Sequence, residues 1–536
     1  MFEVQNQPPP LEGYNLFTGD LVLREAVARE GADWGQGRLT SLGGELGLPE
    51  TIALGFAANR FPPQLKAFDR FGHRLDEVEF HPAWHALMTL ALKGGLHSSP
   101  WADPKPGAHV LRAAGCYMLG QIESGVLCPL AMTYGSVPTL RQNRAVAKEW
   151  LPRIFSHYYD PHFRPAREKT SALVGMGMTE NQGGSDLRTN VTRAEPADGG
   201  FRLFGHKWFM SAPMCDAFLI LANAPKGLSC FLMPRWTPDG ERNAVNINRL
   251  KDKLGNKSNA SSEVEFDGAY AELIGEEGRG IPTIIEMGNY TRLDCAIGSS
   301  SLMRQAVAQA VHHAMHRTAF QKKLVDQPLM TNVLADLALE AEAAAVLTFR
   351  LARAYDESDQ AAQVFRRVMT PAAKFWICKR ALTVTGEAME VLGGSGYIEE
   401  SIMPRLYREA PVNSIWEGSG NVMCLDVLRA LDRTPGAAEV LAAEFDVGDE
   451  PRVQPFLDRL AERLAAPDRR DEAQARALVR DLVLALQAAL LVRHAPPEVA
   501  DAFCASRLEQ GSGAVFGTLP RGVDAAAIVA RAAPLQ

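Results

Sequence analysis

Glu417 is the acidic residue of this sequence whose neighbours best suit a general base. It lies between Trp416 and Gly418, within the segment Arg408–Asn421. An apolar wall excludes water from a carboxylate and raises its pKa, which is the direction that a base working near neutral pH requires. Gly418 lets a substrate approach the backbone closely. Taken alone, the pattern also fits an acidic residue in a loop or at a helix cap.

The segment Met176–Asp186 carries groups that suit a flat cofactor with a phosphate tail. It follows an apolar run and offers the hydroxyls of Thr179 and Ser185 beside the pair Gly183-Gly184. A flavin has a hydrogen-bonding ring edge, a ribityl chain and a pyrophosphate, so it needs backbone N–H groups, small hydroxyls and close backbone approach. An ordinary strand-to-loop transition has a similar composition.

A second segment, Gly205–Ala212, brings an aromatic ring and a hydroxyl together. Trp208 can cover a flat ring, and Ser211 can donate a hydrogen bond to its polar edge. A strand with a buried tryptophan is the alternative interpretation. Both segments therefore need support from the rest of the chain.

The elements that position these residues change character along the chain. The first ~170 residues have mostly helical apolar spacing. Short apolar or alternating runs separated by Gly, Asn, Asp and Pro then predict an antiparallel β unit. These runs are Ala172–Met178, Phe201–Phe204, Ala217–Ala222, Leu228–Met233 and Val264–Phe266. Helical patterns return after Gly278.

Three helices are expected in the second helical region, over Leu302–Met315, Asn332–Tyr355 and about Pro371–Leu392. Proline is allowed in a first helical turn, and Gly393-Gly394 is a plausible stop. After Asp432 comes a linker or weakly helical joint, followed by a last helical unit from about Val453 to Arg531, broken at Pro496-Pro497.

We therefore predict an α+β multidomain fold with four parts in the order α, β, α, α. The boundaries are a helical domain over 1–170, a middle β domain over 171–277, a second helical domain with the candidate base over 278–436, and a C-terminal helical domain over 437–536. At 536 residues the chain is too long for one ordinary core.

Five motifs in this order resemble the acyl-CoA dehydrogenase family. Besides the three segments above, Arg317-Thr-Ala-Phe320 followed by Gln327 is similar to the family's Arg-x-x-Phe element. Leu392–Tyr397 is similar to its Gly-Gly-x-Gly-Tyr loop. The resemblance covers roughly Ala113–Leu431. It implies a middle β-barrel domain between helical domains, with a helical bundle as the second helical domain and FAD between the β unit and that bundle.

The resemblance also implies which residues contact FAD. Arg317 and Phe320 would reach the FAD of a neighbouring subunit, and Gly393 and Gly394 would lie near its pyrophosphate or adenine side. The implied cofactor-binding residues are Met176, Gly177, Met178, Thr179, Gly183, Gly184, Ser185, Trp208, Met210, Ser211, Ala212, Arg317, Phe320, Gln327, Gly393, Gly394, Ile415, Trp416, Ser419, Gly420, Asn421 and Val422.

In that family a base removes the α-proton of an acyl-CoA thioester while the β-hydride passes to the flavin. Glu417 occupies the position of the usual base. Isovaleryl-CoA dehydrogenases carry the base on an earlier helix, where this sequence has Thr291, which cannot serve. Glu417 is then the single candidate. The sequence departs from many members at Glu390, where they carry Gln.

The extra C-terminal ~100 residues and the exact residues within the motifs resemble one branch, the AidB-like subfamily of the adaptive response to DNA alkylation. That resemblance implies a homotetrameric FAD flavoprotein that binds double-stranded DNA, takes part in DNA repair and has weak acyl-CoA dehydrogenase activity of the isovaleryl-CoA type. A genuine acyl-CoA dehydrogenase or oxidase with an added domain, and a flavin-bound scaffold with a vestigial base, are the alternatives.

Charge gives mixed support for DNA binding. The formal net charge of −7 argues against non-specific coating of nucleic acid or acidic membranes. From Arg433 onward there are 12 Arg, no Lys and 15 acidic residues. Six arginines still share one helical region, although a solvated face with ion pairs explains them as well. They are Arg459, Arg463, Arg469, Arg470, Arg476 and Arg480.

Other features predict a cytoplasmic protein without a metal. None of the eight cysteines forms a Cys-x-x-Cys pair, so we expect buried, reduced thiols. The first residues lack a secretory signal, and no run approaches the ~20 apolar residues of a membrane span. His312 and His316 lie one helical turn apart, but no third ligand follows at a suitable spacing.

Overall fold

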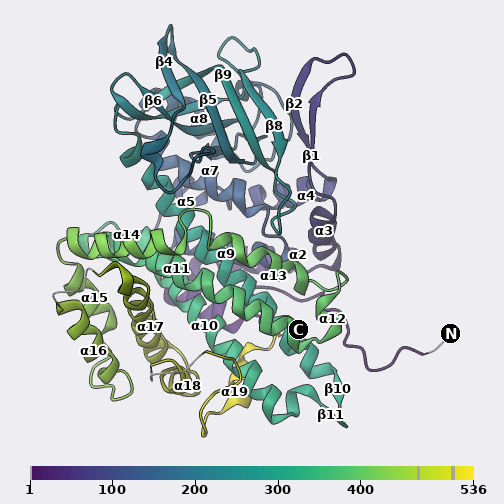
Figure 1. The fold of residues 1–536 in the computed structure, drawn as a ribbon. Helices are drawn as coiled ribbons and strands as arrows, with labels where there is room; N and C mark the ends of the chain where they lie inside the picture. Colours follow the sequence, from purple (N-terminus) through teal and green to yellow (C-terminus); the bar gives the residue numbers. More distant parts are fainter. Residues whose placement is uncertain (1–2, 467–470, 509–513, 536) are drawn as a thin grey trace. The chain divides into compact units, whose positions relative to one another are not determined.

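The computed structural model describes residues 3–466, 471–508 and 514–535. The chain divides into two compact units, which are considered separately (Figure 1). The first comprises Met1–Pro49, Lys105–Gln121 and Cys295–Gln536, and the second comprises Glu50–Pro104 and Ile122–Asp294.

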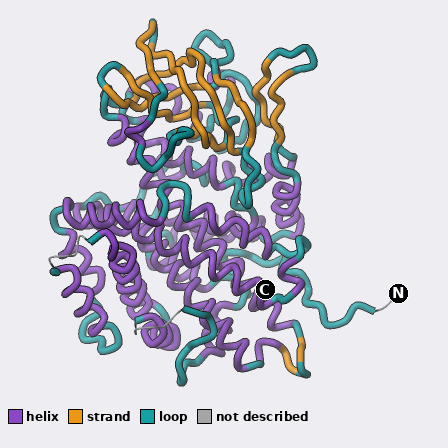
Figure 2. Tube along the Cα trace, viewed as in Figure 1, coloured by secondary structure: helices purple, strands orange, loops and turns teal. Residues whose placement is uncertain are grey.

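The second unit is built on a seven-stranded sheet that closes on itself. β4 pairs with β5, β5 with β9, β9 with β7, β7 with β6, and β6 again with β4, which makes a ring of five strands. β3 and β8 extend it at β6 and β9, and Figure 2 shows these strands gathered in orange. The strands are β3 (Val174–Gly177), β4 (Arg193–Ala197), β5 (Gly200–Ser211), β6 (Ala217–Ala224), β7 (Gly227–Pro234), β8 (Val245–Leu250) and β9 (Ser261–Ile274). The predicted β-barrel domain is confirmed.

The barrel's most buried part is the hairpin formed by β6 and β7. All eight residues of β6 pair with β7, from Ala217 opposite Pro234 to Ala224 opposite Gly227. Phe218 to Leu221 are fully buried, although side chains alternate across a strand. Both faces of β6 are therefore covered, which explains its continuous apolar run.

The sequence pattern located five of these seven strands and missed β4 and β8. The sheet is also mixed, because β3 and β4 both run parallel to β6, whereas the pattern predicted an antiparallel unit. β4 has no large apolar residue and contains a proline, and half of the residues of β8 are polar, so their apolar signal is weak.

A hairpin also interrupts the first 170 residues, which we expected to be mostly helical. β1 (Gln64–Phe68) pairs with β2 (Arg74–Glu79), and the Asp69 carboxylate accepts the backbone N–H groups of Phe71 and His73 in the turn. The helices of this unit are α3 (Pro49–Arg60), α4 (Pro82–Lys93), α5 (Ser99–Ala102), α7 (Leu127–Leu140) and α8 (Arg144–Ile154).

Long helices dominate the first unit. They are α9 (Gly280–His316), which begins in the second unit, α10 (Pro328–Asp356) and α11 (Gln360–Val391). Shorter helices are α1 (Leu21–Arg29), α2 (Gln36–Leu46), α6 (Ala108–Ile122), α12 (Gly394–Tyr397), α13 (Met403–Asn413) and α14 (Gly420–Arg433). The last are α15 (Ala437–Phe445), α16 (Gln454–Ala465), α17 (Ala475–His494), α18 (Pro497–Arg507) and α19 (Ala525–Ala532).

The predicted start of α11 at Pro371 was wrong. The helix begins at Gln360, where the Asp359 carboxylate caps it by accepting the N–H of Ala362 at 3.0 Å, and Pro371 lies inside it. An N-cap aspartate is a strong start signal, whereas an internal proline removes one backbone hydrogen bond without necessarily ending a helix. The predicted end held, because α11 stops at Val391, before Gly393.

Buried ion pairs attach the C-terminal helices to α10. The Arg507 guanidinium of α18 pairs with Asp336 and, at 3.2 Å, with Glu340. Arg531 of α19 pairs with Glu342 at 3.0 Å. The side chains of Arg507, Asp336 and Glu340 are at most 5% exposed. The C-terminal helices are thus part of the same compact unit as α10.

Candidate functional site

The loop that carries Glu417 has an unusual backbone. It connects α13 to α14, and both Glu417 (φ 59°) and Gly418 (φ 106°) lie in the left-handed region. For a residue with a side chain this conformation is uncommon, and such residues cluster at functional sites. Glu417 is half-buried. Its predicted raised pKa stays a prediction.

Contacts on both sides hold this loop. The Trp416 indole N–H donates to the Asn413 side-chain oxygen at 3.1 Å, and the Trp416 backbone N–H donates to the Val412 carbonyl. A Cβ added to Gly418 would lie 2.4 Å from the Met423 Cε, so the position tolerates no side chain without repacking. Glu417 therefore lies in a loop of defined shape.

The two segments expected to contact the flavin ring lie side by side in the second unit. The backbone N–H of Trp208 donates to the Thr179 carbonyl at 2.9 Å, which joins β5 to the loop after β3. Gly184 packs against Thr179, because a Cβ there would lie 2.3 Å from its hydroxyl oxygen. The structure thus brings Met176–Ser185 and Trp208–Ala212 together.

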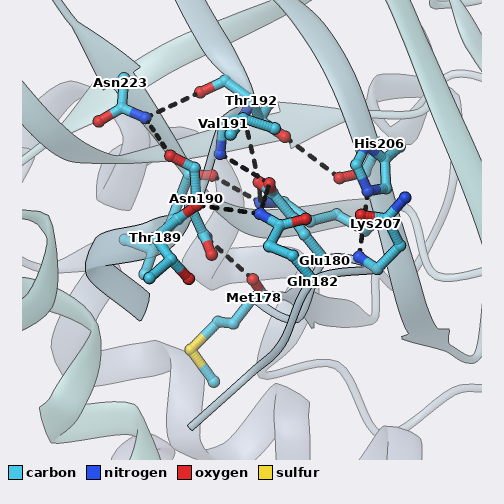
Figure 3. A network of polar contacts seen from close by, with 12 residues as sticks. Met178, Glu180, Gln182, Thr189, Asn190, Val191, Thr192, His206, Lys207 and Asn223 are labelled. Atoms are coloured by element: carbon cyan, nitrogen blue, oxygen red, sulfur yellow. Dashed lines mark hydrogen bonds and ion pairs between the residues drawn. The ribbon is translucent and has the colours of Figure 1, made fainter. Parts of the chain in front are cut away.

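A fully buried ion pair supports the first of these loops (Figure 3). The Lys207 ammonium donates to the Glu180 carboxylate at 2.7 Å and to the Leu221 carbonyl at 2.8 Å, and both charged side chains are 0% exposed. The N–H groups of Val191 and Thr192 also donate to Glu180. The Glu180 carboxylate, near the start of the loop, is therefore bound both to Lys207 of β5 and to Val191 and Thr192 at the end of the loop.

The pKa values of the pair show that it is charged near neutral pH. Burial alone would raise the pKa of Glu180, but the Lys207 charge and hydrogen bonds from Lys207 and Thr192 outweigh it and lower that pKa to about 2. Burial lowers the pKa of Lys207 to about 8, against the opposing effect of Glu180. Buried charges persist only when paired in this way.

Amide side chains extend this network around the loop (Figure 3). Asn190 donates to the Met178 carbonyl at 3.0 Å, and Asn223 of β6 donates to the Asn190 carbonyl at 2.6 Å. Gln182 donates to the Glu180 carboxylate at 2.8 Å and to the Thr189 carbonyl at 3.0 Å. The carbonyls that define the loop's path are fixed by the barrel strands.

Trp208 lies against a cation. The Lys251 ammonium is 3.8 Å from the centre of the Trp208 ring and pairs with Glu263 at 2.5 Å. Nearby, the Ser211 hydroxyl lies 3.4 Å from that of Ser261. A cation over an indole face is attractive. Lys251 therefore fixes the orientation of the half-buried Trp208 ring.

The Arg-x-x-Phe element forms a short hairpin in the first unit. β10 (Thr318–Ala319) and β11 (Lys322–Lys323) are joined by Phe320 and Gln321, which both have positive φ, and Phe320 is 93% exposed. The Gln327 side chain donates to the Ala319 carbonyl at 2.9 Å. The hairpin thus presents an aromatic ring at its tip.

Residues near the start of the chain hold the base of this hairpin. The Asn6 side chain donates to the Thr318 carbonyl at 2.7 Å and accepts the Thr318 N–H at 2.8 Å. The Arg317 guanidinium donates to the Asn6 carbonyl, and the His312 ring lies 2.8 Å from the Pro9 carbonyl. Asn6 therefore contacts both residues at the root of the hairpin.

The remaining predicted contacts lie at the exposed glycines where α12 begins, in the loop before α14 and in the first turn of α14. Gly393 (φ 61°) precedes α12, and a Cβ at Gly393 or Gly394 would meet no atom within 4 Å. Asn421 accepts a hydrogen bond from Arg476 at 2.8 Å. The Thr291 hydroxyl donates to the Gly288 carbonyl at 3.1 Å, so α9 offers no base at that position.

The arginines proposed for DNA contact make intramolecular contacts. Asp481 pairs with Arg463 at 2.8 Å and with Arg480 at 2.7 Å. Arg459 donates to the Leu508 carbonyl. Arg469 and Arg470 lie outside the described residues.

Sequence reasoning missed the supporting lysines Lys207 and Lys251. The signal for Lys207 was a charged residue at an inward position of a strand. Among the residues that the structure describes, no group of three His, Cys, Asp or Glu is placed to hold a metal ion. No helix within those residues is long and apolar enough to cross a bilayer.

Comparison with known proteins agrees with this geometry. Residues 6–161 match the AidB N-terminal domain of the adaptive response protein, 175–269 the acyl-CoA dehydrogenase middle domain, and 278–431 the acyl-CoA dehydrogenase C-terminal domain. The chain is 48% identical over 516 residues to AidB of Escherichia coli (strain K12), which is assigned to the acyl-CoA dehydrogenases, covering 95% of each chain.

Two solved structures have a similar fold. Caenorhabditis elegans ACDH-11 in complex with C11-CoA has a TM-score of 0.87 at 27% identity, covering 94% of this chain and 93% of that one. An acyl-CoA dehydrogenase from Bacillus anthracis complexed with FAD has a TM-score of 0.67 at 18% identity, covering 84% and 82% of the two chains, which shows a likeness of fold.

The chain belongs to the acyl-CoA dehydrogenase family. Within that family, the relation to AidB over nearly the whole length places it in the AidB-like subfamily. It is an FAD-dependent oxidoreductase acting on CH–CH bonds. The residues present fit FAD, because the hydroxyl of Thr179 and the indole of Trp208 lie on two segments joined by a hydrogen bond.

Proposed function

We propose that this protein is an AidB-like flavoprotein in which Glu417 is the catalytic base toward an acyl-CoA thioester. The observation that supports the role of Glu417 most directly is its strained, half-buried position in a fixed loop. Strain at a residue with a side chain persists only where the surroundings hold it, and it is typical of catalytic residues. We expect weak activity, of the isovaleryl-CoA type.

Glu417 would break the α C–H bond by accepting its proton, while the β-hydrogen leaves as a hydride and a Cα=Cβ double bond forms. FAD, when bound, supplies the hydride acceptor. Met176–Ser185 and Trp208–Ala212 would hold the ring, and Ile415–Val422 would contact it beside the base. Hydrogen bonds to the thioester carbonyl would stabilise the charge that develops there.

Arg317 and Phe320 would complete the site of a neighbouring subunit in a homotetramer. The exposed phenylalanine at the hairpin tip supports this role, because an aromatic ring that is 93% exposed gains from burial against a partner. The left-handed φ of Phe320 also suits a residue that is held for binding.

We also propose the four domain boundaries given above and a cytoplasmic location for this protein.

Replacing Glu417 with Gln tests the base. The flavin of the wild-type protein should bleach when an acyl-CoA is added anaerobically, and Glu417→Gln should slow this by at least about 100-fold while FAD content is unchanged. Glu399→Gln is a control, because Glu399 is an exposed acid paired with Arg408. Bleaching at the wild-type rate in Glu417→Gln would refute the assignment.

We also propose that the protein binds double-stranded DNA as part of DNA repair after alkylation. The relation to AidB supports this, and the C-terminal helices offer exposed arginines, Arg476 and Arg480. Both lie on α17, one helical turn apart, so they can follow a phosphate backbone together.

A mobility-shift titration over a range of salt concentrations tests DNA binding. Each phosphate contact contributes a slope of about −0.9 in log K against log salt. Arg476→Gln/Arg480→Gln should therefore make the slope less steep by about 2, while Arg24→Gln, at an exposed position of α1, should leave it unchanged. A wild-type protein that shows no salt-dependent retardation would contradict the proposal.

A genuine acyl-CoA dehydrogenase or oxidase with an added C-terminal domain is the second candidate. It is favoured by the likeness to ACDH-11, whose structure contains C11-CoA and which covers 94% of this chain. A panel of acyl-CoAs of increasing chain length separates the two, because fast bleaching by one chain length would favour the second candidate.

A further inference from the structure

A buried lysine, Lys374, lies against the loop that carries Glu417. Lys374 of α11 is 1% exposed, and its ammonium donates to the Gly418 carbonyl. Within the described residues it forms no ion pair. A buried ammonium is costly unless it is paired, so a lysine at this position needs a reason beyond packing.

The loop needs such a contact. Glu417 and Gly418 both have positive φ, which an amino acid with a side chain adopts at a cost. The carbonyl that Lys374 binds belongs to Gly418, so this bond fixes the Gly418–Ser419 peptide plane, the second one after Glu417. A hydrogen bond from a charged donor is about twice as strong as one between neutral groups.

The neighbours of Lys374 along α11 make contacts of their own. One turn along α11, Cys378 accepts a hydrogen bond from the Ser299 hydroxyl at 3.2 Å, and its own thiol points to the Cys295 carbonyl at 3.5 Å. Phe375, the next residue of α11, packs against Gly420. The polar groups of Ser299, Cys378 and Cys295 therefore bond with one another, and the Lys374 ammonium bonds to the Gly418 carbonyl of the loop.

We propose that Lys374 is a positioning residue for the reaction, which holds Glu417 in its productive orientation through the Gly418 carbonyl. This inference rests on the proposed role of Glu417. Because misplacing a reacting group by about 1 Å can cost about 100-fold in rate, losing this single bond should slow proton removal strongly. Binding of FAD and of acyl-CoA should change little.

Two substitutions of Lys374 separate its hydrogen bond from its bulk. Lys374→Met keeps an unbranched side chain without a donor, and Lys374→Gln keeps a donor without a charge. Flavin reduction at saturating acyl-CoA should slow by about 10- to 100-fold in Lys374→Met, with the same half-saturating concentration, and should be largely restored in Lys374→Gln. Lys148→Met, at an exposed position of α8, is the matched control.

Hydrogen–deuterium exchange on the full-length protein with FAD gives a second readout. Residues 415–420 should exchange at least about 10-fold faster in Lys374→Met than in wild type, because local opening exposes their amides. Wild-type exchange and wild-type reduction in Lys374→Met would overturn the positioning role. If Lys374→Met does not fold, equal rates in Lys374→Gln and in a Lys374→Ala variant would overturn it as well.

Glu417→Gln, measured in parallel, keeps the two proposals distinguishable. If Glu417→Gln reduces its flavin at the wild-type rate, the role of Glu417 fails. If Glu417→Gln is inactive and Lys374→Met is unaffected, only the positioning role fails.

Discussion

Removing the ammonium of Lys207 should destabilise the β-barrel and loosen the loop that follows β3. The Lys207–Glu180 pair is 0% exposed at both side chains, with 2.7 Å between Nζ and Oε1. Lys207→Met leaves the Glu180 carboxylate buried without its counter-charge. Breaking a buried pair from one side costs about 3–5 kcal/mol. The N–H groups of Val191 and Thr192 remain, so we expect the lower half of that range.

The pKa of Glu180 gives the pH dependence of this effect. Burial would raise that pKa, but the Lys207 charge and the hydrogen bonds from Lys207, Thr192 and Val191 outweigh burial and lower it from 4.5 to about 2. Because the folded pKa lies below the unfolded one, this stability is present above pH 4.5 and is lost as the pH falls toward 2. Lys207→Met should therefore reduce the sensitivity of stability to acid.

A double-mutant cycle in urea, with hydrogen exchange of residues 176–192, measures this effect. Glu180→Met/Lys207→Met should recover most of the loss, because an apolar pair of similar size replaces both charges. Lys226→Met, whose side chain is 76% exposed, is the control and should cost under about 0.5 kcal/mol. The reasoning would be refuted if Lys207→Met cost less than about 1 kcal/mol, or if the double variant were no more stable than the single one.

Three further changes have defined outcomes. Phe320→Ala should lower FAD retention and tetramer content, measured by absorbance and mass photometry; unchanged values would exclude its role in a partner's site. Arg507→Met leaves Asp336 buried without its counter-charge and Glu340 with Arg380 alone, so α18 should lose hydrogen-exchange protection, with a cost of about 3 kcal/mol. Burial raises the pKa of Asp356 from 3.8 to about 6, so its contribution to stability is lost as the pH rises through this window. In thermal unfolding between pH 4 and 7, Asp356→Asn should lack this loss; identical pH profiles would contradict it.

Local sequence carried most of what could be predicted about the site. Glu417, Trp416 and Gly418 are neighbours, and the glycine-rich turns and Trp208 lie in short motifs whose chemistry can be interpreted directly. The strand Ala217–Ala224 was visible for the same reason, since its apolar run is continuous. What these residues share is a signal within about ten positions of the chain.

The features that could not be predicted depend on contacts between residues that are distant in the sequence. Glu180 and Lys207 are 27 positions apart, and Lys374 and Gly418 are 44 apart, so only the folded chain shows that they meet. β4 was missed because its partners, and not its own composition, make it a strand. The C-terminal arginines shared one helical region in the sequence, but the pairing of Arg463 with Asp481 required α16 and α17 to pack together.

The hold of Asn6 on the hairpin has a practical consequence for mapping experiments. Asn6 is 312 positions from Thr318, which it binds twice. A fragment shortened past Asn6 would release the base of the hairpin and, with it, the subunit contact proposed for Phe320. Loss of colour or assembly in such a fragment would then report this missing support, and a tag fused ahead of residue 6 deserves the same suspicion.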